Sequence, residues 1–115
     1  MTFAATIDYS SDKARIAEFR PLHREYQEGL RKQSKLVIAG PFTDDSGALI
    51  VYNAGSQAEV ESIIQADPFY KHGIFLSWVI REWKIVKANF DLLPKEPTGC
   101  RPSPASRNSR RCPRG

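Results

Sequence analysis

Two short apolar runs joined by a turn constrain the fold of this chain more than any other feature. The runs are residues 35–40 (KLVIAG) and 48–53 (ALIVYN), and both are rich in residues that favour strands. Between them, Pro41 ends the first run and residues 43–47 form a Thr-Asp-Asp-Ser-Gly cluster that favours a turn. We therefore predict a β-hairpin in the middle of the chain.

A helical pattern precedes the hairpin. From Pro21 to about Gln33, four residues recur at helical spacing and share one broad face: Leu22, His23, Tyr26 and Leu30. A polar cluster at residues 10–12 is suited to capping a helix. Because Pro21 has no backbone N–H, we expect either a kink there or a new helix that starts at Pro21, after a short helical turn over residues 12–19.

A second helical pattern follows the hairpin. Ser56 and Glu59 match the S-x-x-E capping box at the start of a helix. Asp67 precedes Pro68, and the residue before a proline is disfavoured in the helical conformation, so we expect the helix to end there. Residues 69–73 are predicted to be a short connection.

Two further strand patterns lie outside these helices. Residues 2–9 alternate loosely, and residues 74–86 are rich in β-branched and aromatic residues, with a break in alternation that indicates a bulge near Ser77. The order β-α-β-β-α-β predicts an α+β, ferredoxin-like fold: a four-stranded antiparallel sheet with two helices on one face. The other face would carry too many large apolar residues to remain in water, which predicts a homodimer.

Charge divides the chain at about residue 94. Residues 95–115 hold six basic residues and one acidic residue, whereas residues 1–94 hold 11 basic and 12 acidic residues. We predict one domain over residues 1–94 and a disordered basic tail over residues 95–115. The tail has no aromatic residue to stack on bases, so nucleic-acid binding is not the favoured interpretation. Its two cysteines, Cys100 and Cys112, do not form a zinc-site pattern.

No apolar run is long enough to span a membrane, and the first residues lack the basic and apolar stretches of a secretion signal. We therefore expect a cytoplasmic protein with no membrane partner.

One group of residues could carry chemistry. His23 is expected to face the sheet from the first helix, and Asp67 ends the second helix on the same sheet face. A buried aspartate that accepts the imidazole N–H fixes the tautomer and raises the basicity of the ring, which suits a general acid/base. Arg20 lies one helical turn before His23 and could bind an anionic substrate. Metal binding would need more ligands, so neither a metal nor a cofactor is expected.

Each of these residues also has a structural interpretation. His23 could be a core histidine with satisfied hydrogen bonds, Asp67 a cap of a short turn, and Arg20 a solvated side chain. His72, beside Gly73, is interpreted as a loop histidine.

The sequence resembles the YciI-like (YCII-related) family of small α+β proteins. The resemblance covers roughly residues 2–87 and rests on four elements: Arg20-Pro21-x-His23, Ala39-Gly40-Pro41, Ala66-Asp67-Pro68-Phe69-x-x-x-Gly73 and the final aromatic strand. It implies a ferredoxin-like fold, usually dimeric and related to the dimeric α/β-barrel proteins, and a histidine-aspartate site carried here by His23 and Asp67. One branch of the family is tied to lyase-type dehalogenation of a hydroxylated aromatic ring, a substrate that nothing in this sequence specifies.

These observations predict a small, cofactor-free acid/base enzyme, of lyase or hydrolase type, that acts on a small aromatic or anionic metabolite. The alternative is a non-catalytic dimeric module that binds a small ligand or serves as an accessory domain. Geometry separates the two: an enzyme needs His23 and Asp67 within hydrogen-bond reach and a cavity beside them.

Overall fold

The computed structural model describes residues 1–94. Along the chain lie the elements β1 (Thr2–Tyr9), α1 (Lys13–Lys32), β2 (Leu36–Pro41), β3 (Gly47–Asn53), α2 (Gln57–Gln65), α3 (Pro68–Lys71), β4 (Phe75–Glu82) and the 3-10 helix η1 (Phe90–Leu92). The chain divides into two compact units, and the first, Met1–Ile85, contains every strand and α-helix named here. The second begins at Val86, and its described part holds η1. The predicted tail over residues 95–115 lies outside the described residues.

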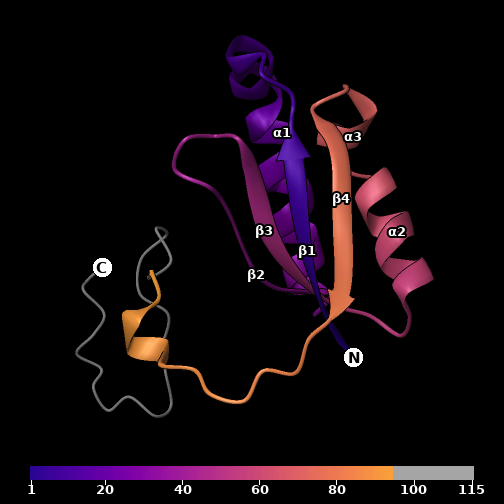
Figure 1. Ribbon diagram of the computed structural model, residues 1–115, viewed down its shortest axis with the longest axis vertical. Helices are drawn as coiled ribbons and strands as arrows, with labels where there is room; N and C mark the ends of the chain where they lie inside the picture. Colours follow the sequence, from indigo (N-terminus) through magenta and orange to yellow (C-terminus); the bar gives the residue numbers. More distant parts are fainter. Residues whose placement is uncertain (95–115) are drawn as a thin grey trace. The chain divides into compact units, whose positions relative to one another are not determined.

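The four strands form one antiparallel sheet in the order β2-β3-β1-β4, and α1 and α2 lie on one face of it (Figure 1). The predicted ferredoxin-like fold is confirmed. In the predicted hairpin, the Phe42 N–H donates to the Gly47 carbonyl at 2.8 Å. Gly47 has no room for a side chain because the Ile7 carbonyl lies directly against it, so glycine is required where the hairpin meets β1.

Helix α1 is one continuous helix rather than two pieces. Asp12 caps it by accepting a hydrogen bond from the Arg15 N–H at 3.1 Å, and the helix passes through Pro21. Of the two alternatives expected at Pro21, the new helix start is therefore wrong. A proline inside a helix removes one backbone hydrogen bond and disturbs the preceding turn, and the packing of a 20-residue helix on the sheet outweighs that local cost.

The region from Asp67 to Glu82 differs from its prediction in two places. Residues 68–71 form the short helix α3 instead of an irregular connection, because Asp67 caps it and Pro68 occupies its first turn. Strand β4 ends at Glu82, not at residue 86. Its partner β1 begins at Thr2, and the Trp83 N–H makes the last hydrogen bond to the Thr2 carbonyl at 2.8 Å.

The predicted bulge near Ser77 is confirmed. Asp8 pairs with Ser77 and Tyr9 pairs with Phe75, so Leu76 is an extra residue on β4. The bulge lies at the end of β1 that carries Tyr9, and this is also the end of the sheet beside α3.

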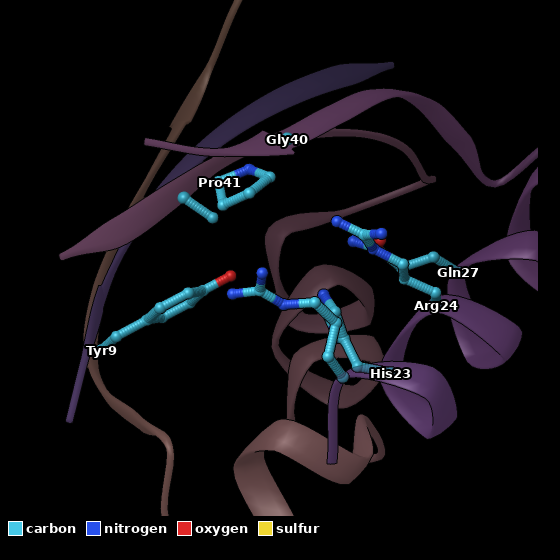
Figure 2. A pocket seen from close by; sticks show the side chains of 8 residues that line it. Tyr9, His23, Arg24, Gln27, Gly40 and Pro41 are labelled. Atoms are coloured by element: carbon cyan, nitrogen blue, oxygen red, sulfur yellow. The ribbon is translucent and has the colours of Figure 1, made fainter. Parts of the chain in front are cut away.

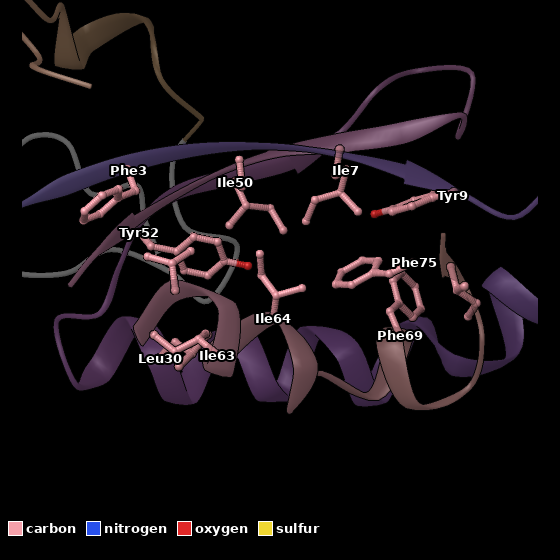
Figure 3. Close-up of a cluster of buried hydrophobic side chains, with 14 of the residues drawn as sticks. Phe3, Ile7, Tyr9, Leu30, Ile50, Tyr52, Ile63, Ile64, Phe69 and Phe75 are labelled. Atoms are coloured by element: carbon pink, nitrogen blue, oxygen red, sulfur yellow. The ribbon is translucent and has the colours of Figure 1, made fainter. Parts of the chain in front are cut away.

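The hydrophobic core lies between the sheet and the two helices (Figure 3). Alternate residues of β1 point into it and meet apolar side chains from β3, α1, α2 and the segment around α3. The core residues of all these elements include Phe3, Ala5, Ile7, Ile16, Leu30, Ile50, Tyr52, Val60, Ile64, Phe69 and Phe75. Two polar residues, His23 and Asp67, are buried with them. None of the described helices has the length and apolar character needed to cross a membrane.

Candidate functional site

Asp67 is the buried acid of the fold, with 1% of its surface exposed. It lies between α2 and α3, where its Oδ1 accepts a hydrogen bond from the Phe69 N–H at 2.9 Å and so caps α3. This local bond fixes the orientation of the carboxylate toward α1. The capping role considered from the sequence is therefore present, and it positions the carboxylate for a second interaction.

That second interaction is with His23, in the middle of α1. The His23 Nδ1 lies 2.8 Å from Asp67 Oδ1 and 3.0 Å from Oδ2, and only 5% of the histidine surface is exposed. An ionised carboxylate can only accept, so Nδ1 carries the proton in this pair. When the ring is neutral, its lone pair is then on Nε2. Within residues 1–94, no hydrogen bond engages Nε2.

Aromatic rings hold the plane of His23. The Phe69 ring stacks on the imidazole with centroids 4.0 Å apart and an interplanar angle of 3°, and Phe75 meets it edge-on at 5.8 Å. The hydrogen bond to Asp67 and the stack on Phe69 together fix the direction in which Nε2 points. This is the preorganisation that a proton-transfer group needs.

A small pocket opens beside His23 (Figure 2). Its cavity volume is about 20 Å³, which is room for about one water molecule and far below the range of about 300–1,000 Å³ that is usual for ligand pockets. Its walls come from the end of β1, from α1 and from the hairpin β2–β3, and its lining residues are Tyr9, Arg20, His23, Arg24, Gln27, Gly40, Pro41 and Ala48. It is therefore a narrow recess beside His23 rather than a preformed pocket of ligand size.

Tyr9 faces the pocket from the sheet, opposite α1 (Figure 2). Burial raises the pKa of its hydroxyl from 10.0 to about 12, and the negative charges of Asp67 and Asp45 act in the same direction, while Arg20 and Arg24 oppose them. Tyr9 therefore keeps its proton at neutral pH and can donate a hydrogen bond. Among the described residues, its hydroxyl has no hydrogen-bond partner.

The arginine predicted from the sequence is already in an ion pair. Arg20 reaches the pocket, but its Nη2 also donates to Asp45 Oδ1 at 2.8 Å. Asp45 lies in the hairpin loop, in a left-handed conformation with φ of 59°. Any anion that binds Arg20 would share the guanidinium with this carboxylate.

The structure thus brings His23, Asp67 and Arg20 to one region, and His72 is not among the pocket residues. His72 instead stacks on Phe19 with centroids 3.8 Å apart. Sequence reasoning missed Tyr9 and two residues of α1, Arg24 and Gln27. Spacing was the available signal for α1, because residues 20, 23, 24 and 27 fall on one helix face.

Three tyrosines near this site make the stability of the fold sensitive to alkaline pH. Burial, as the largest cause, raises the pKa of Tyr9 and Tyr26 to about 12 and raises the pKa of Tyr52 further. The unfolded chain releases these protons near pH 10, before the folded chain does, so the free energy of unfolding should fall as pH rises from about 10 to 12. Urea unfolding at several pH values would check this, and a constant midpoint above pH 10 would contradict it.

No group of three or more histidine, cysteine, aspartate or glutamate side chains suited to a metal ion occurs in the part of the chain that the structure describes. The chemistry that the described residues support is proton transfer by a fixed imidazole beside a small, cationic pocket.

Comparisons with known proteins agree with this fold. The model of the YCII-related domain family matches residues 1–84. Among curated proteins, the uncharacterized protein YjpA of Bacillus subtilis (strain 168) is 35% identical over 65 residues, which are 56% of this chain and 75% of YjpA.

Two solved structures are similar. One is the 5-chloro-2-hydroxyhydroquinone dehydrochlorinase TftG of Burkholderia phenoliruptrix AC1100, in complex with 2,5-dihydroxybenzoquinone. It is 28% identical, with a TM-score of 0.65, over 73% of this chain and 94% of TftG. The other, an antibiotic biosynthesis monooxygenase, is 14% identical with a TM-score of 0.49, over 76% of this chain and all of that structure.

Proposed function

This chain belongs to the YCII-related domain family, and on that premise we propose that it is a small acid/base enzyme of lyase or hydrolase type. Its substrate is a small aromatic or anionic metabolite, and the reaction needs no cofactor. His23 moves the proton, Asp67 orients the imidazole and stabilises its positive charge, and Arg20 helps to bind an anionic group of the substrate.

One observation carries the proposal: the His23–Asp67 hydrogen bond of 2.8 Å leaves Nε2 without a partner in the described residues, on a ring that lines the pocket. A proton taken up at Nε2 creates an imidazolium. The buried Asp67 carboxylate stabilises that charge at hydrogen-bond distance, and the imidazolium can then return the proton as an acid. A satisfied core histidine would have both ring nitrogens occupied and no adjacent cavity.

The similarity to TftG supports the same reaction class. TftG is a dehydrochlorinase, and dehydrochlorination removes a proton and a chloride from one molecule. A histidine base suits such an elimination, and no redox step is required. The fold is shared by proteins with many functions, so the substrate of TftG is not assigned to this chain.

Solvent-deuterium exchange tests the proposed function. Small hydroxy-aromatic compounds and small carbonyl acids are incubated with the protein in D2O, and NMR follows deuterium incorporation and elimination products. We expect the wild type to accelerate exchange or elimination for members of this panel. No acceleration for any compound would contradict the proposal.

A pocket-blocking variant locates the activity. Gln27 lines the pocket from α1, so Gln27→Trp should fill the pocket while leaving the His23–Asp67 bond in place. Glu25→Trp puts the same side chain at an exposed position of the same helix, as the matched control. Exchange should be lost in the first variant and kept in the second. Full activity of Gln27→Trp would place the chemistry elsewhere.

We also propose that the protein is a homodimer that packs through the sheet face opposite the helices. On that face, Leu49 and Val79 flank Thr6 in the strand register. Leu49 is 42% exposed and Val79 is 59% exposed. A second copy would cover this row with the same residues, as a two-fold interface does.

A charge on the open sheet face should separate the dimer. Val79→Glu would place a carboxylate in the apolar row, and we expect it to convert a wild-type dimer into a monomer in multi-angle light scattering. Leu22→Glu is the control, because Leu22 is an exposed apolar residue on α1, in the helical layer. A monomeric wild type at micromolar concentration would contradict the proposed dimer.

A further inference from the structure

Two buried polar groups face the pocket without a partner among residues 1–94. Tyr9 is 7% exposed, yet no hydrogen bond from these residues reaches its hydroxyl. His23 is also buried, and its Nε2 likewise has no hydrogen-bond partner there. A buried polar atom without a partner costs free energy, so such atoms are usually paired with water or with a ligand. Figure 2 shows the Tyr9 hydroxyl pointing across the pocket from the sheet, with His23 on the opposite wall.

A shared aromatic wall fixes both groups. Tyr9 meets the Phe69 ring edge-on at 5.5 Å and stacks on Phe75 at 6.0 Å. His23 contacts the same two rings: it stacks on Phe69 with centroids 4.0 Å apart and meets Phe75 edge-on at 5.8 Å. Neither ring can turn without disturbing this cluster. The hydroxyl and the imidazole therefore form a preorganised pair of polar contacts for one ligand.

The charge of the pocket selects the ligand. Arg20 and Arg24 are its two cationic lining residues. Asp45 pairs with Arg20 at 2.8 Å, whereas Arg24 has no acidic partner within the described chain. The other nearby acid, Asp67, is bonded to His23, so Arg24 is the lining cation without an acidic partner in the described chain, and it favours a ligand that carries a negative charge.

We infer that Tyr9 and Arg24 together bind the charged oxygen of a small organic monoanion, and that an acidic hydrogen of the same ligand faces His23 Nε2. Tyr9 donates its hydroxyl proton to that oxygen, and Arg24 supplies the charge and further N–H donors. The position of the acidic hydrogen rests on the proposed function. The binding of the anion does not, since it needs only the hydroxyl, the guanidinium and the pocket.

Binding of known anions tests the inference without knowledge of the substrate. The probes are benzoate and acetate, two carboxylates that are monoanions at neutral pH, and benzamide serves as the neutral counterpart of benzoate. Isothermal titration calorimetry on the full chain should show that both anions bind and that benzamide binds much more weakly. If neither anion binds at millimolar concentration, or if benzamide binds as well as benzoate, the inference is wrong.

Two substitutions separate the contribution of the Tyr9 hydroxyl to anion binding from that of the Arg24 guanidinium. Tyr9→Phe keeps the ring against Phe69 and Phe75 and removes only an unpartnered hydroxyl, so the fold should be unaffected while anion affinity falls about tenfold. Arg24→Gln should weaken the anions by about tenfold as well, leave benzamide unchanged and reduce the salt dependence of binding. Wild-type anion affinity in Tyr9→Phe would overturn the inference even if Arg24→Gln behaved as expected.

Matched controls exclude general effects of charge and hydroxyl loss. Lys32→Gln removes one positive charge from an exposed position of the same helix, and Tyr70→Phe removes a hydroxyl outside the pocket. Neither should change anion affinity.

Failure of the proposed enzyme activity and failure of the anion-binding inference give different results. If the anions bind as expected but no compound undergoes exchange, the proposed enzyme activity fails and the binding site stands. If exchange depends on the pocket but Tyr9→Phe binds anions normally, the binding assignment fails and the proposed activity stands.

Discussion

Replacing Asp67 with alanine should lower the free energy of unfolding by about 3 kcal/mol, because it breaks a buried pair and removes a helix cap in one step. The carboxylate is 1% exposed, caps α3 through the Phe69 N–H and accepts from His23 Nδ1 at 2.8 Å. Small domains are stable by about 5–15 kcal/mol, so this loss is a large fraction of the total. Urea unfolding of the wild type and of Asp67→Ala measures this difference in the free energy of unfolding.

Asp12→Ala is the matched control for the cap. Asp12 accepts from the Arg15 N–H at 3.1 Å at the exposed start of α1, with no histidine partner, and its loss should cost about 1 kcal/mol. Asp67→Asn should lie between the two alanine variants, because an amide oxygen can still accept from Phe69 and from Nδ1. If Asp67→Ala costs no more than Asp12→Ala, the bond to His23 contributes nothing to stability.

Replacing His23 with glutamine should reduce the rate of proton transfer by about 10²–10⁴-fold while the protein remains folded. A glutamine amide can donate to Asp67 and so satisfy the buried carboxylate, but it cannot take up a proton. The rate is measured as kcat in the deuterium-exchange assay, with circular dichroism to verify the fold.

His72→Gln is the control for this substitution. His72 is the other histidine of the chain, and it stacks on Phe19 outside the pocket lining. It should keep wild-type activity. A His23→Gln variant with full kcat would remove His23 from the reaction, whatever its contact with Asp67.

Much of the fold was predictable because local signals agreed with one another. The Ser56 cap is observed, with its hydroxyl accepting from the Glu59 N–H at 3.2 Å, and the hairpin and bulge lie where the pattern placed them. The errors came from long-range effects. The end of β4 depends on where β1 starts, 80 residues earlier, and the continuity of α1 through Pro21 depends on packing against the sheet.

The candidate site was predictable only in part. His23 and Asp67 could be paired because the topology puts both on one face of the sheet, and the family resemblance pointed to the same two residues. Tyr9 had a signal that was overlooked: it continues the alternation of Phe3, Ala5 and Ile7 toward the helices. No signal in the sequence indicated the contact of Arg20 with Asp45, since this contact depends on the conformation of an irregular loop.

The central claim is that His23 presents an unprotonated Nε2 to the pocket while Asp67 holds the proton on Nδ1. Nitrogen-15 NMR of the imidazole, recorded across a pH titration with and without benzoate, tests it directly. We expect the neutral ring to carry its proton on Nδ1 and its lone pair on Nε2, and we expect benzoate to perturb the Nε2 resonance. A neutral ring with its proton on Nε2 would contradict the account.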